Sequence, residues 1–550
     1  MNFRISELCK PTLFSVLKQG YGKEQFGKDL FSGIIVGIVA LPLAIAFAVA
    51  SGVSPEKGLI TAVIAGFIIS FLGGSRVQIG GPTGAFIVIV FGVLHQYGFN
   101  GLLISTILAG FFLILFGILK LGTLLRYIPH PLIVGFTSAI ALVIFSTQIK
   151  DALGLEIRSV PGDFAGKWAT YFGALATTNK YAVVITIITI FITVAFKKIT
   201  TKIPGSFVAI IFVTIFVQAF NIDVRTIETT FGAIPQKISF SAPSLDWSQV
   251  QMYFSPALTI ALLGAIESLL SAVVADGMIG SKHDSNTELI AQGVANVVTP
   301  FFGGIPATGA IARTATNVKN GGRTPIAGIT HALTLLLIML FFGNYAQLIP
   351  MPCLAGILIV VAYNMSEWRS FASIFKGSFF DISILLVTFF LTIFVDLTVA
   401  IEVGVVLAAL LFMKRMSDAG GLHTSAIDKD VLENYSDLPK GVSIYEISGP
   451  FFFGSAKSYC NTLREIGAKS QVLIIRMRHV PFIDQTAIHN LRGVVTDLQA
   501  SKTKVILSGV NQKVYAELDK SKLVALLGEA NILPSFDQAV RVAKGIVAGL

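Results

Sequence analysis

Charged residues are scarce in this sequence: Asp, Glu, Lys and Arg make up 13% of its 550 residues, whereas hydrophobic residues make up 54%. The mean hydropathy is correspondingly high, at +0.77. A water-facing globular protein has roughly a quarter of its residues charged, so most of this chain does not fit that class. The composition indicates an integral membrane protein.

Cysteine is almost absent as well, because only Cys9, Cys353 and Cys460 occur and they lie far apart. This spacing excludes a disulfide framework and gives no metal-binding motif. The sequence also lacks a P-loop, an HExxH or GxSxG motif, a kinase signature and any basic run interleaved with aromatic residues. We therefore expect no enzymatic activity, no cofactor and no nucleic-acid partner.

Long apolar runs fill the first 415 residues. A membrane helix needs about 20 apolar residues, and Gly and Pro divide the runs into about fourteen such segments. The runs are continuously apolar rather than alternating, which favours helices over the strands of a barrel. The expected helices lie near 29–50, 58–72, 82–94, 102–119, 131–147, 181–197, 206–220, 256–275, 287–300, 308–318, 325–342, 352–364, 381–396 and 399–413.

The distribution of Lys and Arg predicts the orientation in the membrane. If the N-terminus is inside, most Lys and Arg residues of the short loops fall on the cytoplasmic side, and this bias accounts for the net charge of +10. Residues 1–28 contain no apolar core ahead of a cleavage site, so we expect no cleaved signal peptide. The prediction is a protein of the cell (inner) membrane, with a cytoplasmic segment over 1–28, a transmembrane domain over 29–415 and both termini cytoplasmic.

The composition changes after Arg415. Short β-rich runs then alternate with helical stretches, which predicts a small α/β domain over 441–550. Residues 416–440 are predicted to be the linker between the transmembrane domain and this domain. The β-rich runs lie at 442–447, 472–477 and 504–509, and the helical stretches lie near 455–467, 485–500, 511–518 and 536–548.

The two halves of the membrane region carry matching motifs in the same order. With about seven helices per half, an odd number, the two repeats would be inverted relative to each other. The matches are Ala50-Ser51-Gly52 with Ala275-Asp276-Gly277, Thr83-Gly84-Ala85 with Thr308-Gly309-Ala310, and Ile128-Pro129-His130-Pro131 with Ile349-Pro350-Met351-Pro352.

Gly and Pro interrupt an apolar segment at corresponding positions of the two halves, 79–86 (IGGPTGAF) and 303–310. A helix that starts midway through the membrane points its free N–H groups and the positive end of its dipole into the interior, where an anion can bind. Pro82 suits a first helical turn, where its missing N–H is not needed. Such a matched pair indicates the central site of a transporter. The alternative is that the small residues merely let helices pack closely.

Two ionisable residues are expected near this level. Glu267 lies inside an apolar helix, where a carboxyl group tends to stay protonated, so it is a candidate proton carrier. Arg313 lies early in the second interrupted helix and can attract an anion or pair with Glu267. The alternative is a static ion pair that fixes helix packing. Other polar residues of the region have structural explanations: Asp276, Asp396 and Glu402 as caps or packing contacts, and Ser51, Thr83 and Thr308 as partners of their own helices.

These motifs carry a resemblance to a known family. In their order, and with an α/β tail behind them, they resemble the SulP/SLC26 anion transporters with a C-terminal STAS domain, over nearly the whole chain. Within that family the chain looks most similar to the bacterial DauA-like group of C4-dicarboxylate transporters. The motifs are GIIVGIVALPLAIAFAVASGVSPEKGL, GGPTGAF, AIESLLSAVVADGM, NTELIAQGVAN and FFGGIPATGAIARTATN.

The resemblance implies seven plus seven inverted helices, divided into a core and a gate domain that move as an elevator, usually in a homodimer. It implies that Glu267 occupies a position where sodium-coupled bicarbonate carriers have Asp, which suits proton coupling better than sodium coupling. Arg313 matches a basic position that those carriers lack. The site would lie between the third and tenth helices, and the residues carried over to it are Leu43, Phe47, Thr83, Gly84, Ala85, Phe86, Thr308, Gly309 and Ala310.

The tail contains PFIDQTAIHNL, at 481–491, which resembles the STAS loop in which an Asp precedes a phosphorylated Ser or Thr. Asp484 and Thr486 hold those positions, whereas Gln485 and Ala487 depart from the usual small residues. Regulation by phosphorylation, or by a cytoplasmic protein that binds the STAS domain, is one prediction. The other is that Asp484 is simply a helix N-cap.

The sequence thus predicts a secondary active anion transporter in which Glu267 carries a proton. A channel, an exchanger without proton coupling, and a membrane sensor that signals through the STAS domain are the alternatives. Sulfate, bicarbonate and C4-dicarboxylates all suit an anion site, and the resemblance ranks dicarboxylates first.

Overall fold

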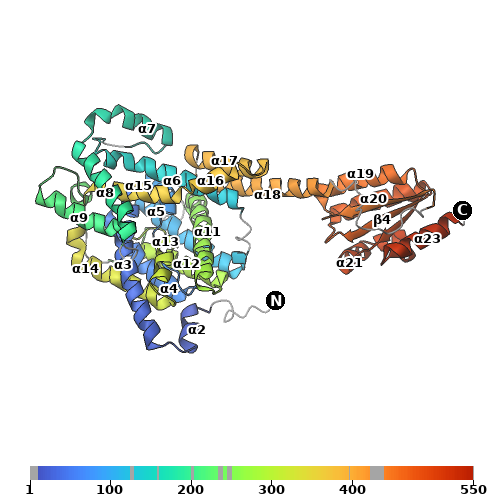
Figure 1. Ribbon diagram of the computed structural model, residues 1–550, viewed down its shortest axis with the longest axis horizontal. Helices are drawn as coiled ribbons and strands as arrows, with labels where there is room; N and C mark the ends of the chain where they lie inside the picture. The colour runs from blue at the N-terminus through green and yellow to red at the C-terminus, as the bar shows by residue number, and fades with distance from the viewer. Residues whose placement is uncertain are drawn as a thin grey trace. The chain divides into compact units, whose positions relative to one another are not determined.

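A computed structural model describes residues 10–123, 129–157, 160–199, 204–232, 239–244, 250–395, 397–421 and 439–548 (Figure 1). The chain divides into two compact units between Val405 and Val406. Helix α18 runs from Leu397 to Gly421, and most of the expected linker, 422–438, lies outside the described residues. Asp396 and Ile128 lie outside them too.

The first unit is almost entirely helical. Its only described sheet consists of two short strands, β1 (Gly80–Gly81) and β2 (Thr308–Gly309), which pair with each other. Its helices are α2 (Thr12–Lys18), α3 (Lys23–Ala50), α4 (Pro55–Leu72), α5 (Ile87–Ile118), α6 (His130–Ala152), α7 (Phe164–Gly173), α8 (Lys180–Ile199), α9 (Gly205–Ala219), α10 (Ile227–Phe231), α11 (Phe254–Ile279), α12 (Ser285–Val298), α13 (Ile311–Lys319), α14 (Pro325–Ala346), α15 (Met351–Met365), α16 (Trp368–Ile374), α17 (Phe379–Phe394) and the start of α18.

Each of the fourteen expected membrane segments falls on a helix, which confirms that part of the prediction. The segments 82–94 and 102–119 both fall on α5, which is kinked at Gly98 because that residue has the non-helical angles φ 70° and ψ −179°. Among the described residues, seven helices are long and apolar enough to cross a membrane. Helices α8, α9 and α17 are apolar but shorter. The short helices α2, α7, α10 and α16 were not expected.

The helices of the first unit form two groups. The first helix group consists of α3, α4, α5, α11, α12, α13 and α14, which pack extensively on one another. The second helix group consists of α6, α8, α9, α15 and α17. Few residues join the two groups, mainly where α3 meets α9 and α15 and where α5 meets α6. We call this boundary the seam.

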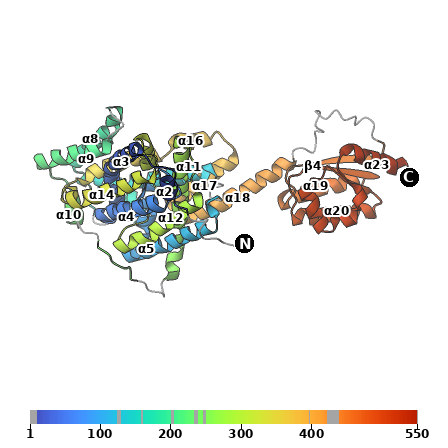
Figure 2. The same ribbon diagram turned by 90° about the horizontal axis from the view of Figure 1, so that it is seen from below.

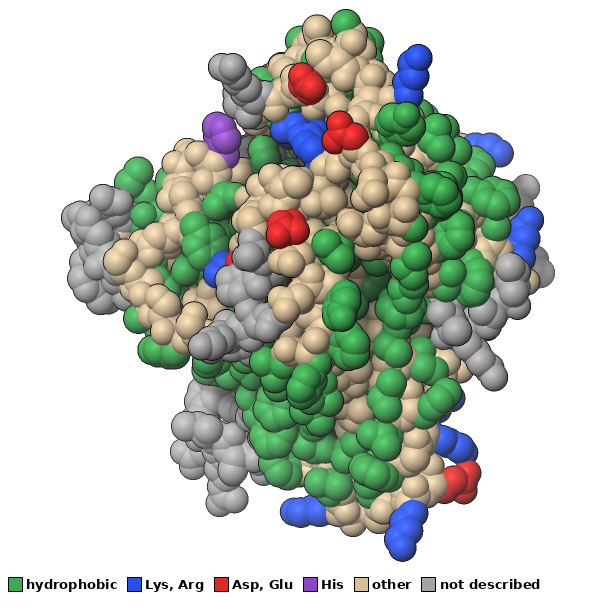
Figure 3. Space-filling view, turned by 90° about the vertical axis from the view of Figure 1, so that its left-hand side faces the viewer, with side chains coloured by type: hydrophobic (Ala, Val, Ile, Leu, Met, Phe, Trp, Pro, Cys, Tyr) green, Lys and Arg blue, Asp and Glu red, His purple; other side chains and the backbone are tan. Residues whose placement is uncertain are grey.

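Large hydrophobic side chains are exposed on the outer faces of these helices. Phe191 of α8 is 70% exposed and Phe341 of α14 is 71% exposed. On the face drawn in Figure 3, hydrophobic side chains cover a broad area, while most Lys and Arg side chains lie toward its edges. A water-soluble protein rarely exposes so large an apolar surface, so this surface suits the hydrocarbon of a bilayer.

The second unit is an α/β domain with one parallel four-stranded sheet in the order β3-β4-β5-β6. Helices α19 and α20 share a hydrophobic core on one face of the sheet, and α23 covers the other face (Figure 2). The expected strands and helices are confirmed, whereas β6 and α22 were missed. The bounds are β3 (Val442–Ser448), α19 (Phe453–Gly467), β4 (Val472–His479), α20 (Gln485–Ala500), β5 (Lys504–Ser508), α21 (Gln512–Lys520), α22 (Leu523–Leu527), β6 (Ile532–Leu533) and α23 (Phe536–Ala548).

Candidate functional site

The two Gly/Pro-interrupted segments meet in space. Strand β1 pairs antiparallel with β2, with Gly80 opposite Gly309 and Gly81 opposite Thr308. A short 3-10 turn follows β1 and leads into α5, and α13 begins directly after β2. Segments that lie in different halves of the sequence therefore bring two helix N-termini together.

Two glycines permit this close approach. A Cβ atom at Gly309 would lie 1.6 Å from Nε2 of Gln78, a side chain that is held by bonds to the carbonyl and hydroxyl oxygens of Ser268. Gly81 has φ 152°, and a Cβ atom there would lie 2.5 Å from Nη1 of Arg313. A larger residue at either position must displace a buried polar side chain, so glycine is required at both.

A cavity of about 360 Å³ lies on the seam beside this strand pair. Its lining comes from both helix groups, since α6 and α15 contribute as well as α3, the 3-10 turn before α5, α11 and α13. Eight residues expected at the site line it: Leu43, Phe47, Thr83, Gly84, Ala85, Glu267, Ala310 and Arg313. Seven further described residues line it: Thr137, Ile311, Ala312, Val361, Asn364, Met365 and Glu367.

Neither helix that starts at the cavity has a capping side chain. Thr83 precedes the turn that leads into α5, and Ala310 precedes α13, and neither side chain accepts a hydrogen bond from the first helical turn. The first N–H groups of a helix have no partner within the helix. Because Gly84, Ala85 and Ile311 line the cavity, the positive ends of two helix dipoles lie at one place, which favours a bound anion.

Arg313 places a positive charge beside the same cavity. Its side chain is 1% exposed, and Nη2 donates a hydrogen bond of 2.9 Å to the carbonyl oxygen of Pro82. Nη1 is buried and has no hydrogen-bond partner. Within the described residues, no salt bridge joins Arg313 to Glu267 or to any other carboxylate, so the static ion pair is not formed. The guanidinium instead turns toward β1, where Gly81 leaves room for it.

The three hydroxyl side chains considered from the sequence differ in their partners. Ser51 donates to the carbonyl of Phe47 in its own helix at 2.7 Å, as expected. Thr308 instead donates to the carbonyl of Gly264 in α11 at 2.7 Å and so fixes β2 against that helix. The hydroxyl of Thr83 is buried and has no partner. Thr83 therefore keeps a donor for a ligand in the cavity.

Glu267 lies in α11 and faces the cavity as a partly buried side chain. In the described part of the chain its carboxyl group makes no hydrogen bond and no salt bridge. The second carboxyl group at the cavity, that of Glu367, is on an exposed residue at the start of α16. Of the two, Glu267 is the less solvated.

Three expected site residues do not line the cavity. Phe86 is 2% exposed and packs against α11, where its ring lies 3.4 Å from the position of a Cβ atom at Gly264. Thr308 and Gly309 form β2 and position the cavity rather than face it. Reasoning from the sequence missed Thr137, Asn364 and Glu367, because no local motif marks them and only the packing of the second helix group brings them to the seam.

Other polar residues considered from the sequence do not line the cavity. Asp276 accepts from the backbone N–H of His283 at 2.9 Å and lies 2.7 Å from Nδ1 of the same residue, at the end of α11. Glu402 is exposed on α18. Asp484 is the N-cap of α20: it accepts from the N–H of Ala487 at 2.8 Å and from that of Phe453 at 2.9 Å. The expectation of a cap is confirmed, and Thr486 beside it is exposed.

Residues 26–388 match the Sulfate permease family, and residues 437–539 match the STAS domain. The chain belongs to the sulfate permease family. This family protein is 43% identical to the putative sulfate transporter YvdB of Bacillus subtilis, over 96% of this chain and 99% of the relative. It is 30% identical to the bicarbonate transporter BicA of Picosynechococcus sp., over 94% of each chain.

Solved structures give the same fold. Murine Slc26a9, described as an anion transporter in the inward-facing state, matches with a TM-score of 0.88 at 19% identity, over 99% of this chain and 95% of that chain. The transmembrane domain of a cyanobacterial BicA matches with a TM-score of 0.61 at 29% identity, over 70% of this chain and 98% of that chain. None of these relatives is named as a DauA-like protein, so the resemblance of this chain to that group stays a prediction.

Proposed function

We propose that this protein is a secondary active transporter of a small anion and that a proton accompanies the anion. One observation carries the proposal: two uncapped helix N-termini and the unneutralised cation of Arg313 lie at one cavity between two helix groups. A buried charge without a partner is costly, and a bound anion offsets that cost.

The relatives guide the choice of anion. The names of YvdB and BicA point to sulfate and bicarbonate, so these inorganic anions are our first candidates. A C4-dicarboxylate is the next candidate, because the sequence resembles the DauA-like group and because a cavity of about 360 Å³ suits a small organic ligand as well. Ala85, Ala310 and Ala312 keep the lining small at the helix N-termini.

The seam supports an elevator-type movement. The strand pair, the two helix N-termini and Arg313 all belong to the first helix group and its connections, whereas Thr137 and Asn364 face them from the second group. If the first helix group slides along the second, the anion moves with the helix N-termini and Arg313 that bind it. The cavity can then open to the other side of the membrane. A homodimer and a cytoplasmic partner of the STAS domain remain predictions of the resemblance.

Glu267 is the proposed proton carrier. A carboxyl group inside the membrane costs less free energy when it is protonated, and an anion in the same cavity strengthens that preference by charge repulsion. Anion and proton therefore favour each other's binding, which is the condition for symport. Because no cation forms an ion pair with Glu267 in the described residues, no ion pair holds its carboxylate in the deprotonated form, and rebinding of the proton is not opposed in that way.

The test is uptake of labelled sulfate, bicarbonate, succinate and fumarate into proteoliposomes, with and without an inward proton gradient. Glu267→Gln should abolish gradient-driven uptake and leave anion exchange intact. Glu367→Gln and Glu402→Gln serve as matched controls, because the first residue lines the same cavity and the second lies on another membrane helix. Uptake that the gradient does not drive in the wild type would refute proton coupling. Binding of an anion without any flux would refute transport and favour a sensor.

A further inference from the structure

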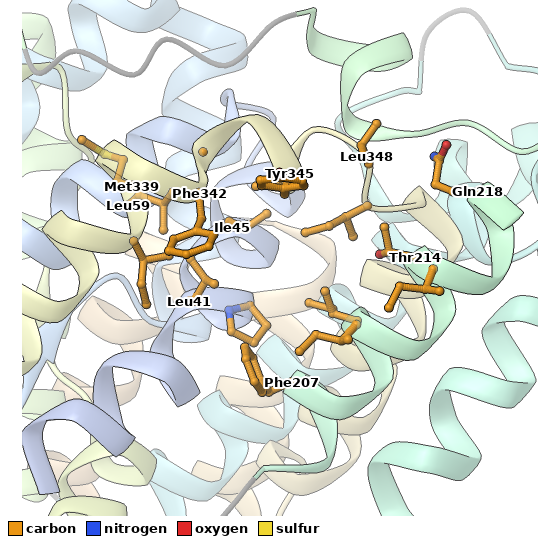
Figure 4. A pocket seen from close by; sticks show the side chains of 18 of the residues that line it. Leu41, Ile45, Leu59, Phe207, Thr214, Gln218, Met339, Phe342, Tyr345 and Leu348 are labelled. Atoms are coloured by element: carbon orange, nitrogen blue, oxygen red, sulfur yellow. The ribbon is translucent and has the colours of Figure 1, made fainter. Parts of the chain in front are cut away.

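A second and larger cavity, of about 630 Å³, lies elsewhere on the seam (Figure 4). Helices α3, α4 and α14 of the first helix group form one side of it, and α9 of the second group forms the other. We call it the apolar cavity, because its lining is almost wholly hydrocarbon. Leu41, Ile45, Leu59, Phe207, Ile210 and Met339 are typical of that lining.

The apolar cavity is separate from the anion cavity, although α3 lines both. Leu43 and Phe47 face the anion cavity, whereas Leu41 and Ile45 face the apolar cavity. Residues four apart lie on the same face of a helix, and residues two apart lie on nearly opposite faces. The helix therefore separates the two cavities, and none of the described residues that line the second one is charged.

The opening of the apolar cavity is continuous with the surface that faces the bilayer. Several residues of its lining are themselves strongly exposed: Ile215 of α9 at 63%, Phe342 of α14 at 59% and Tyr345 of α14 at 68%. On a membrane-spanning unit these side chains contact lipid. The compound with the most direct access to the cavity is therefore a membrane lipid, since its hydrocarbon already covers the rim.

One end of the apolar cavity is polar. Thr214 and Gln218 lie on one side, whereas Leu41, Leu59 and Met339 lie on the other (Figure 4). The hydroxyl of Thr214 is buried and has no partner. Gln218 and Tyr345 belong to the last turns of α9 and α14, where membrane helices commonly place amphipathic side chains at the level of the lipid headgroups. The cavity thus runs from an interfacial polar end to a hydrocarbon end.

We propose that the apolar cavity binds one acyl chain of a membrane glycerophospholipid. The ester group of the lipid lies at Thr214 and Gln218, where the unpartnered hydroxyl donates to an ester oxygen, and the chain extends along Leu41, Ile45 and Met339. The volume is in the range of about 300 to 1,000 Å³ that small-molecule sites occupy. A soluble apolar ligand would have to cross the headgroup region first, and a second protein chain would have to insert a segment into a cavity between helices.

Such a lipid would also affect transport. Its acyl chain would lie between α9 and the first helix group, so sliding along the seam must displace or reshape it. We therefore expect an occupied cavity to change the rate of anion exchange without changing the affinity for the anion. This consequence rests on the proposed function, whereas the binding site itself rests only on the cavity.

The experiment uses the full-length protein in liposomes of phosphatidylethanolamine and phosphatidylglycerol with a small fraction of phosphatidylcholine that carries a diazirine in the middle of one acyl chain. After irradiation, the modified residues are mapped by mass spectrometry. In the wild type we expect modification to concentrate on the lining of the apolar cavity, at Ile45, Ile210 and Met339. Thr214→Trp should reduce this modification by roughly tenfold, because the indole ring occupies part of the cavity and excludes the acyl chain.

Phe212→Trp is the matched control, because Phe212 is 53% exposed on the same helix and does not line the cavity. Ala346→Phe fills the cavity from α14 and is the second test if Thr214→Trp fails to fold. Modification that spreads evenly over the outer surface and that neither filling variant reduces would overturn the proposal. Lipid modification at the cavity of a protein that transports no anion would refute the proposed function and leave the lipid site standing.

Discussion

Substitution of Arg313 is the sharpest test of the anion site. If Arg313 binds the anion, its loss should not lower the stability of the anion-free protein, whereas if Arg313 only stabilises the fold, its loss should lower that stability. Arg313→Met removes a buried cation that has one hydrogen bond, to Pro82, and no carboxylate partner in the described residues. If an anion binds to this cation, losing one charge-assisted hydrogen bond costs about 1.5 to 3 kcal/mol of binding free energy. The Kd should therefore rise by about 10- to 150-fold. Without anion, stability should stay the same or increase, since an unpaired buried charge is destabilising.

Both quantities can be read from thermal unfolding of purified protein at increasing anion concentration. At 100 times its Kd, an anion stabilises the wild type by about 2.7 kcal/mol, whereas the same concentration stabilises a variant with a Kd raised 100-fold by only about 0.4 kcal/mol. Arg313→Lys is the control, because it keeps the charge and loses the planar geometry of the guanidinium. The reasoning is refuted if Arg313→Met unfolds at a clearly lower temperature without anion and binds the anion with an unchanged Kd.

Three further predictions concern the rest of the molecule. Gly309→Ala places a Cβ atom 1.6 Å from Nε2 of Gln78, so it should destabilise the membrane unit by about 3 kcal/mol or more, measured by thermal unfolding, and Gln78→Ser in the same chain should recover part of the loss. Asp484→Ala removes two capping bonds and should cost the STAS domain about 1 to 2 kcal/mol in urea unfolding, whereas Asp484→Asn should cost less; equal losses would contradict the capping role. Burial raises the pKa of the Cys460 thiol from 9.0 to about 11. The thiol is therefore protonated more readily in the folded state, and the free energy of unfolding should fall as the pH rises from about 9 to about 11, with a weaker fall in Cys460→Ala.

The membrane helices were predictable because hydrocarbon imposes a length and a composition on each of them. The central break was predictable for a related reason: Gly80, Gly81 and Pro82 interrupt an apolar run, and the second half repeats the interruption. The kinked joining of two segments at Gly98 was not predictable, because a glycine in an apolar run marks a turn, a kink or a packing contact equally well.

The lining of the anion cavity divides in the same way. Thr83, Gly84 and Ala310 belong to the repeated motif, so the sequence alone identified them. Thr137 comes from the second helix group and Glu367 from the connection between α15 and α16, and only the packing across the seam brings them to the cavity. Arg313 shows a third case, since its position near the site was expected but its orientation was not. The guanidinium of Arg313 binds the carbonyl oxygen of Pro82 rather than the carboxylate of Glu267 because Gly81 leaves space for it, and no sequence pattern reveals that space.

Helix α3 lines both cavities of the seam, so a lipid bound in the apolar cavity can act on the anion cavity through this helix. Phe47 faces the anion cavity and Ile45 faces the apolar cavity, and Pro42, which also lines the apolar cavity, precedes both inside the helix. A proline in a helix interior removes one backbone hydrogen bond and permits bending at that point. An acyl chain against Leu41 and Ile45 therefore acts on the part of α3 that is most easily bent. If the lipid changes the exchange rate through this bend, Pro42→Ala should reduce the difference in rate between wild type and Thr214→Trp, and an undiminished difference would indicate that the lipid acts through α9 instead.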